Sequence, residues 1–292
     1  MVITRPTKVF ALFGDPVAHS LSPVMQNRAF AYHGLPFCYI PFRVRREDLN
    51  AAVVAIRALG LGGVNITIPH KEQVIPYLDE VDREARLIGA VNTILNQNGR
   101  LIGYNTDGAG FLLSLNAEIN FTPGGKRVVL LGAGGGARAV AFSLALGGTR
   151  ALAIFNRNLE RAQVLAEDLR RATGCDVETG NLRDDFLYPA LARADLLVHA
   201  SPVGMYPHHE EAPLVKAELL PPGLVVCDLV YNPPKTRLII EAEARGCRVL
   251  SGIGMLVYQG ALAFEIWTGL RAPVEVMRAA VKENLHNFES AS

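Results

Sequence analysis

The chain has 292 residues, a formal net charge of +1, 50% hydrophobic residues and 20% charged residues. This length suggests about two domains of roughly 150 residues each, and the ordinary apolar content excludes intrinsic disorder. The near-neutral charge offers no basic field to a phosphate backbone, and the longest apolar runs are too short to span a bilayer, so neither nucleic acid nor membrane is an expected partner. The four cysteines form no C-x-x-C pair. We therefore expect a reduced, cytoplasmic protein with no metal site.

The first third of the chain alternates short apolar runs with segments of helical period, which is typical of an α/β fold. It predicts strands over residues 8–13, 39–44 and 63–68, and helices over residues 23–32, 48–58 and 82–88. Ser22 followed by Pro23 favours a helix start, because serine can cap free N–H groups and proline is tolerated at the first helical position. A hairpin is predicted over residues 91–104, with Asn98 and Gly99 in its turn.

The composition changes at the turn-rich residues 121–125, where we place a change of domain. Further strands are predicted over residues 128–131, 152–155, 196–199, 225–229 and 248–250, joined mostly by helices. They make up most of a doubly wound, Rossmann-type parallel sheet. Helices over residues 255–267 and 274–285 follow, and we expect them to pack back on the first domain. The predicted architecture is thus two α/β domains, residues 1–108 with 256–292 and residues 109–255.

A glycine-rich turn follows the strand predicted at residues 128–131 and precedes a helix predicted from about residue 137 to 146. Its sequence, GAGGGA over residues 132–137, matches the G-x-G-x-x-A pattern. Glycines permit close backbone approach to a pyrophosphate, and a helix N-terminus offers it free N–H groups. A glycine-rich turn alone is weak evidence. The strand before it, the helix after it and the next strand at the right distance together predict dinucleotide binding.

The residues after the second strand of this domain predict the cofactor. Asn156 stands where an NAD-dependent enzyme usually carries an acidic residue for the ribose 2′-hydroxyl, and Arg157 and Arg161 follow it. Two guanidinium groups can bind a 2′-phosphate by charge-assisted hydrogen bonds, whereas a carboxylate would repel it. We therefore expect NADP, with NAD as the alternative. Arg161 could instead belong to a solvated helix face.

Four short polar motifs stand at the ends of strands predicted in the first third of the chain. They are HSLSP (residues 19–23), NITIPHK (residues 65–71), AVNT (residues 90–93) and NTDG (residues 105–108). Ser20 and Ser22 beside a helix start could hold a small carboxylate. Lys71 and Asp107 could form an acid–base pair for a hydroxyl proton. Each motif alone could be a cap, a turn or a surface ion pair, and finding four of them favours a functional site.

Nine motifs cover nearly the whole chain. In order they are HSLSP, NITIPHK, AVNT, YNTDG, LLGAGGGARA, FNRN, SPVGM, DLVYNP and GMLVYQGALAFEIWTG. By these motifs the chain resembles the shikimate dehydrogenase family. The resemblance implies an N-terminal substrate domain joined to an NADP-binding Rossmann domain. The implied reaction is the reversible reduction of 3-dehydroshikimate to shikimate, in chorismate and aromatic amino acid biosynthesis.

The resemblance also implies a role for each residue that matches a family motif. It places the substrate carboxylate on Ser20 and Ser22, and it makes Lys71 and Asp107 the catalytic pair. The residues implied near the ring hydroxyls are Thr67, Lys71, Asn92, Asp107 and Gln259, with Tyr231 close to the substrate. The implied cofactor contacts are Gly132, Ala133, Gly134, Gly135, Gly136, Asn156, Arg157, Asn158, Arg161, Met205, Leu229 and Gly252. Hydride would pass between nicotinamide C4 and substrate C3 while Lys71 relays the proton of the C3 hydroxyl.

Two other functions stay open on the sequence. The quinate/shikimate branch of the family can use NAD and quinate, and Tyr39 could then be part of the pocket, although Thr67 and the arginine pair favour the biosynthetic enzyme. The third hypothesis is a non-catalytic nucleotide-binding regulator, and the presence of both Lys71 and Asp107 argues against it. In either enzymatic case the partners are small molecules, and we expect a monomer or a homodimer.

His199 and the two histidines of residues 208–211 are not assigned to the site. His199 ends a predicted apolar strand, and we interpret it as a buried histidine with satisfied hydrogen bonds. Residues 208–211, of sequence HHEE, contain metal-ligand residue types but lack the spacing of a helical metal site, so we interpret them as a solvated loop.

Overall fold

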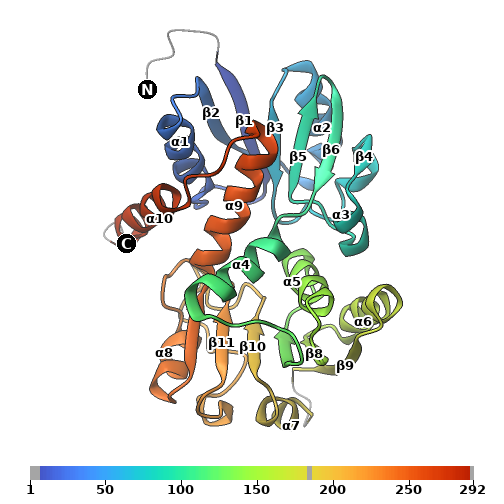
Figure 1. Ribbon diagram of the computed structural model, residues 1–292, viewed down its shortest axis with the longest axis vertical. Coiled ribbons are helices and arrows are strands. Elements are labelled where there is room, and N and C mark those ends of the chain that lie inside the picture. Colours follow the sequence, from blue (N-terminus) through green and yellow to red (C-terminus); the bar gives the residue numbers. More distant parts are fainter. Residues whose placement is uncertain (1–6, 183–185, 290–292) are drawn as a thin grey trace. The chain divides into compact units, whose positions relative to one another are not determined.

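The computed structural model describes residues 7–182 and 186–289, and the chain divides into two compact units (Figure 1). The first unit contains Met1–Asp107 and Val257–Ser292, and the second contains Gly108–Leu256. Each unit is built around its own six-stranded sheet with helices against it. The α/β class and the Rossmann-type sheet expected from the sequence are confirmed.

The sheet of the first unit has the strand order β2-β1-β3-β5-β6-β4. Its strands are β1 (Lys8–Gly14), β2 (Phe37–Arg43), β3 (Gly63–Ile66), β4 (Glu80–Val81), β5 (Thr93–Gln97) and β6 (Arg100–Tyr104). Its helices are α1 (Ser22–Tyr32), α2 (Leu49–Ala58), α3 (Arg83–Ile88), α9 (Gly252–Thr268), which begins in the second unit, and α10 (Val274–Glu289). β1 pairs in parallel with β2 and β3, whereas β5 and β6 form an antiparallel hairpin.

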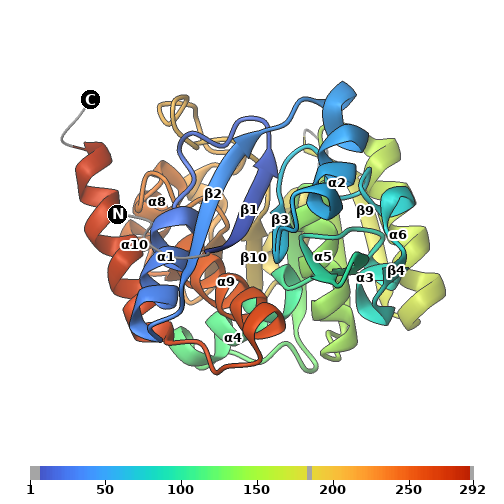
Figure 2. The same ribbon diagram turned by 90° about the horizontal axis from the view of Figure 1, so that it is seen from above.

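Both faces of the first sheet are apolar. Phe10 of β1 packs against Phe30 of α1 and Trp267 of α9, with ring centroids 5.2 and 5.0 Å apart. Its neighbours Ala11 and Phe13 point to the other face, into a core shared with α2 and α3. Figure 2 shows α1, α9 and α10 on one side of this sheet and α2 on the other. Because successive strand residues point to opposite faces, one apolar run in β1 supports both helical layers.

The C-terminal helices pack on the first unit, as the sequence predicts. The Trp267 indole N–H donates to the carbonyl of Ile94 at 3.0 Å, which ties α9 to β5. The Gln26 side-chain amide donates to the carbonyl of Gly260 at 2.8 Å, which ties α9 to α1. Both bonds are buried, so α9 is part of the same core as α1 and β5.

The sheet of the second unit is entirely parallel, with the order β12-β11-β10-β7-β8-β9. Its strands are β7 (Arg127–Leu131), β8 (Ala151–Asn156), β9 (Asp176–Asn181), β10 (Leu196–His199), β11 (Val225–Asp228) and β12 (Arg248–Ser251). The helices are α4 (Asp107–Ile119), α5 (Gly135–Leu146), α6 (Leu159–Thr173), α7 (Leu187–Ala192) and α8 (Arg237–Ala244). The strand order reverses between β7 and β10, which is where doubly wound sheets bind their ligands.

One strand of this sheet was not predicted, and one local expectation was wrong. The unpredicted strand is β9, an edge strand paired with β8, whose largely polar residues DVETGN give no apolar signal. Ser22 does not cap α1, because Leu21 occupies the N-cap position and Ser22 is already helical. Instead, the Ser20 hydroxyl oxygen accepts the backbone N–H of Ser22 at 3.3 Å.

Among residues 7–182 and 186–289, no helix combines the length and the apolar composition that crossing a bilayer requires. All four cysteines are free. Burial, with a smaller contribution from the Asp228 charge, raises the pKa of the Cys227 thiol in β11 well above its ordinary value. Cys227 therefore behaves as a small apolar side chain.

Candidate active site

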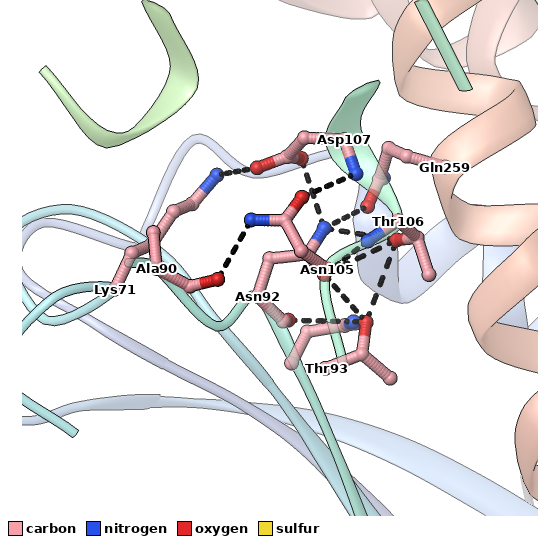
Figure 3. Close-up of polar contacts among 9 residues, drawn as sticks. Lys71, Ala90, Asn92, Thr93, Asn105, Thr106, Asp107 and Gln259 are labelled. Carbon is pink, nitrogen blue, oxygen red and sulfur yellow. Dashed lines mark hydrogen bonds and ion pairs between the residues drawn. The ribbon is translucent and has the colours of Figure 1, made fainter. Parts of the chain in front are cut away.

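A lysine–carboxylate pair lies in the first unit (Figure 3). Lys71 Nζ contacts Asp107 Oδ2 at 2.6 Å, and the two side chains are only 17% and 6% exposed. Lys71 follows β3, and its carbonyl accepts the N–H of Val91 at 2.7 Å, which holds the backbone that carries the ammonium. Asp107 is the first residue of α4. The structure thus brings together two residues that are 36 positions apart in the sequence.

The second oxygen of the Asp107 carboxylate has its own donor. Asn92 Nδ2 donates to Asp107 Oδ1 at 2.9 Å. The Asn92 side-chain oxygen accepts the backbone N–H of Thr106 at 2.8 Å and the hydroxyl of Thr93 at 2.9 Å, which settles which end of the amide is nitrogen. The Asp107 N–H donates to Asn105 Oδ1 at 3.0 Å. The carboxylate is therefore held at both oxygens and at its backbone, and its position determines that of the ammonium.

The hydrogen bonds continue from Thr93 to the start of α1. The Asn65 amide donates to Thr93 Oγ1 at 3.0 Å, and its own oxygen accepts the Tyr39 hydroxyl proton at 2.8 Å. Burial raises the pKa of Tyr39 well above its ordinary value, and a hydrogen bond with Ser22 offsets part of that effect. We call these residues the buried network, which comprises Ser22, Tyr39, Asn65, Lys71, Asn92, Thr93, Thr106 and Asp107.

The other residues expected to contact the substrate lie in different places. Thr67 follows β3 and is half-buried, and Ser20 precedes α1. Gln259 comes from α9, and its Oε1 lies 3.5 Å from Asn92 Nδ2 at the edge of the buried network. Tyr231 follows β11 in the second unit.

Sequence reasoning missed several members of this arrangement. Asn65, Thr93 and Thr106 lie within the NITIPHK, AVNT and NTDG motifs, yet they were not singled out. Their partners lie on neighbouring strands of the sheet, and spacing along the chain does not show which strands pair. The signal that could have found them is the motif itself, because three polar residues at strand ends need partners if they are buried.

The glycine-rich turn connects β7 to α5 at the carboxyl edge of the second sheet. Gly132 has a φ of 124°, and a Cβ atom there would lie 2.6 Å from the Ala200 carbonyl oxygen, so another residue would be strained and would clash. Cβ atoms built at Gly134 and Gly136 meet nothing within 4 Å among the described residues. The space beside these glycines lets a ligand approach the turn that leads into the N-terminus of α5, and the turn fits the pyrophosphate of a dinucleotide.

The turn after β8 carries the residues expected at the 2′-phosphate. Asn158 caps α6, because its side-chain oxygen accepts the N–H of Arg161 at 3.2 Å. The Asn156 amide donates to the carbonyl of Asn158 at 2.8 Å, which holds the turn. Arg157 and Arg161 are both exposed. Two cations beside a helix N-terminus suit an anion such as a phosphate group.

The remaining residues expected at the cofactor also lie in the second unit. Ala133 is buried in the glycine-rich turn, Gly135 begins α5, and Met205 lies in the loop after β10 with 38% of its surface exposed. A Cβ atom at Gly252 would lie 2.1 Å from the Leu229 carbonyl oxygen, so the start of α9 can approach the end of β11 only as glycine.

Residues 208–211 lie in a loop, where the His209 ring contacts Glu210 at 3.2 Å. In the described ranges, no group of three or more His, Cys, Asp or Glu side chains is arranged to hold a metal ion.

The second unit has a doubly wound sheet with a glycine-rich turn, and the first unit buries a lysine–carboxylate pair. Together they define a two-domain dinucleotide-dependent oxidoreductase. Three family models match the chain: the shikimate dehydrogenase substrate binding domain at residues 12–94, shikimate/quinate 5-dehydrogenase at residues 116–206, and the shikimate 5′-dehydrogenase C-terminal domain at residues 252–282.

Individual proteins match over nearly the full length. A shikimate dehydrogenase (NADP(+)) of Methanopyrus kandleri is 53% identical over 283 residues, which cover 97% of this chain and 98% of that protein. The structure of shikimate 5-dehydrogenase from Thermus thermophilus in complex with NADP(H) and shikimate is 40% identical, with a TM-score of 0.85 and coverage of 94% and 99%. Quinate dehydrogenase from Corynebacterium glutamicum in complex with NAD is 32% identical, with a TM-score of 0.87 and coverage of 95% and 99%. The chain belongs to the shikimate dehydrogenase family.

Tyr39→Phe is expected to lower the free energy of unfolding by about 1–3 kcal/mol, because it leaves the buried Asn65 oxygen without its donor. Tyr32→Phe removes the same hydroxyl from a ring that is 65% exposed, and its effect should stay within about 0.5 kcal/mol. Urea denaturation measures both, with the m-value checked for constancy. Equal stability of the two variants would contradict a structural role for the buried network.

Proposed function

We propose that this chain is an NADP-dependent shikimate dehydrogenase, which reversibly reduces 3-dehydroshikimate to shikimate in chorismate and aromatic amino acid biosynthesis. The observation that carries the proposal is the 2.6 Å contact between Lys71 and Asp107, because it puts a proton donor and its partner among buried amides and hydroxyls. Family membership and the names of the relatives support the choice of substrate and cofactor.

The first domain, residues 1–108 and 256–292, binds the substrate. Ser20 and Ser22 hold the carboxylate with their hydroxyl groups, at the start of α1 where the helix dipole also favours an anion. The ring hydroxyls contact Thr67, Lys71, Asn92, Asp107 and Gln259, and Tyr231 lies close to the substrate. Amides and hydroxyls suit this task, because each can donate to one ring oxygen and accept from another.

Lys71 moves the proton at C3. In the reductive direction its ammonium donates a proton to the C3 oxygen as that oxygen becomes a hydroxyl, and in the oxidative direction its neutral amine accepts that proton. An ammonium has three N–H donors, so it can contact Asp107 and the C3 oxygen at once. Asp107 stabilises the charged form, and Asn92 keeps the carboxylate from turning away. The bound nicotinamide supplies or receives the hydride at C3.

The second domain, residues 109–255, binds NADP. The turn of residues 132–136 would hold the pyrophosphate, because its glycines permit close approach and it leads into the N-terminus of α5. Asn156, Asn158, Arg157 and Arg161 surround the 2′-phosphate. Met205, Leu229 and Gly252 border the nicotinamide. The four free cysteines agree with a cytoplasmic location, where thiols stay reduced.

The second candidate is a quinate/shikimate dehydrogenase that uses NAD or NADP. The similarity to quinate dehydrogenase of Corynebacterium glutamicum in complex with NAD, with a TM-score of 0.87, favours keeping this alternative. Arg157 and Arg161 favour the NADP enzyme, since an NAD enzyme has no 2′-phosphate for them to bind. A nucleotide-binding regulator would have no need of a paired Lys71 and Asp107.

Initial rates in a two-by-two design, shikimate or quinate with NADP⁺ or NAD⁺, test the function. We expect the highest kcat/KM with shikimate and NADP⁺, because this pair matches both the serine and the arginine assignments. Comparable values with quinate or NAD⁺ would move the protein to the dual-specificity branch. Absence of turnover with all four pairs would contradict an enzymatic role in this reaction.

Lys71→Ala is expected to lower kcat by about 10²- to 10⁴-fold, because it removes the general acid and base. NADP⁺ affinity should not change, since the proposed cofactor residues all lie in the second unit. Lys282→Ala, at an exposed lysine of α10, is the matched control and should keep the kcat of the unmodified protein. Retention of most of the turnover by Lys71→Ala at saturating substrate would refute the role of this residue.

Arg157→Asp is expected to raise the KM for NADP⁺ by about 10-fold or more and to leave that for NAD⁺ nearly unchanged, because it puts repulsion in place of a charge-assisted contact. Arg245→Asp makes the same charge change after α8 and before β12, at the opposite edge of the sheet, and should affect neither. Equal losses for the two cofactors in Arg157→Asp would contradict the 2′-phosphate assignment.

A further inference from the structure

A second hydrogen-bonded chain lies in the second unit, at the carboxyl ends of β10 and β11. His199, the last residue of β10, is 2% exposed, and its Nδ1 lies 2.9 Å from Asp228 Oδ1 at the end of β11. Its Nε2 lies 2.5 Å from Ser201 Oγ. The Thr236 hydroxyl donates to the other Asp228 oxygen at 2.6 Å. His199 is thus the buried, satisfied histidine that the sequence predicts, and we call these four residues the histidine chain.

The groups at one end of the histidine chain, Thr236 and the Asp228 carboxylate, determine the direction of its hydrogen bonds. Thr236 Oγ1 accepts the N–H of Ile239 at 3.4 Å, so its own proton goes to Asp228. A carboxylate only accepts, so His199 Nδ1 carries a proton and donates it to Asp228. A neutral imidazole with its proton on Nδ1 has a lone pair on Nε2. With the imidazole in this neutral tautomer, Ser201 donates its hydroxyl proton to His199 Nε2.

This direction decides what Ser201 can offer to a ligand. Its only hydroxyl proton is used inside the protein, and one lone pair accepts the N–H of Val203 at 3.4 Å. The hydroxyl oxygen keeps a second lone pair, and the residue is only half-buried. Ser201 therefore presents an acceptor. A matching ligand group has an N–H or an O–H to donate, whereas a carbonyl or phosphate oxygen would meet a lone pair.

The place of Ser201 in the sheet indicates which ligand group that is. The strand order reverses between β7 and β10, so one half of a dinucleotide lies over β7 and β8, next to Arg157, and the other over β10 and β11. The carbonyl of Ala200 lies against Gly132, so the segment that carries Ser201 borders the glycine-rich turn. On its other side, the His199 carbonyl accepts the N–H of Leu229 at 2.9 Å.

We propose that Ser201 Oγ accepts a hydrogen bond from the carboxamide N–H of the nicotinamide, and that His199 is a positioning residue that sets the polarity of this hydroxyl. The donors in the nicotinamide half of the cofactor are the carboxamide N–H and the ribose hydroxyls, and of these the carboxamide belongs to the ring that must be oriented. A fixed contact to it selects one orientation of the ring and hence one face for hydride transfer. The inference rests on the proposed function and adds a contact that determines cofactor orientation.

Equilibrium binding to the full chain, measured by calorimetry, tests this contact without turnover. The 3-acetylpyridine analogue of NADP⁺ has a methyl group where NADP⁺ has the amide nitrogen, so it lacks the N–H and keeps the carbonyl. Ser201→Ala is expected to weaken NADP⁺ binding by about 3- to 10-fold and to change analogue binding less than about 2-fold. Adenosine 2′,5′-bisphosphate, which has no nicotinamide, should bind both proteins equally and thereby reports an intact adenosine half.

His199→Gln is the matched control for the direction of the hydrogen bonds in the histidine chain. A glutamine amide can donate an N–H to Asp228 and accept the Ser201 proton at its carbonyl, so the direction of the chain is kept. This variant should retain the preference of the unmodified protein for NADP⁺ over the analogue. Loss of that preference in His199→Gln, with normal binding of the bisphosphate, would overturn the role of His199.

Equal weakening of NADP⁺ and its analogue in Ser201→Ala would overturn the inference, because it would place the serine at a group that both cofactors share, the carbonyl or a ribose hydroxyl. Unchanged binding of both, or weakened binding of the bisphosphate as well, would also overturn it. Failure of the unmodified protein to bind NADP⁺ at all is a different result, and it would refute the proposed function itself.

Discussion

The need to pair a buried carboxylate is the constraint on which the first unit depends. Asp107 is almost fully buried, and an ionised group in that environment is costly unless every oxygen has a donor. Lys71 supplies one donor and Asn92 the other. The sheet in turn positions each of these residues, so the register of the strands determines the geometry of the site. The ammonium is thereby held in one position, as the acid–base role proposed for it requires.

The second unit meets a different constraint at the carboxyl edge of its sheet. A pyrophosphate must approach backbone N–H groups closely, and a Cβ atom at Gly132 would occupy that turn and clash with Ala200. On the other side of the strand-order reversal, His199 and Asp228 need partners because they are buried. In both units, strand ends bring together polar groups that pair with one another and leave defined donors or acceptors for a ligand.

Features of this fold are predictable from the sequence where the physical signal is local. Apolar strands such as residues 128–131 are recognisable because burial on both faces demands continuous apolar runs. The glycine-rich turn is recognisable because few residue types tolerate its geometry. β9 is an edge strand with polar residues, and it gives no such signal. The cap of α1 was misplaced by one residue, from Leu21 to Ser22, because local sequence does not fix a helix boundary that closely.

The sequence by itself determined the α/β class, most strands, the glycine-rich turn and the identity of Lys71 and Asp107 as candidates. These features follow from residue type and short-range period. Only the tertiary structure decided that Lys71 meets Asp107, and that Tyr39 and Asn65 continue the same buried network. Strand pairing and burial decide these contacts, and both depend on the spatial order of the strands in the sheet. The spacing of residues along the sequence does not show which strands are neighbours in the sheet.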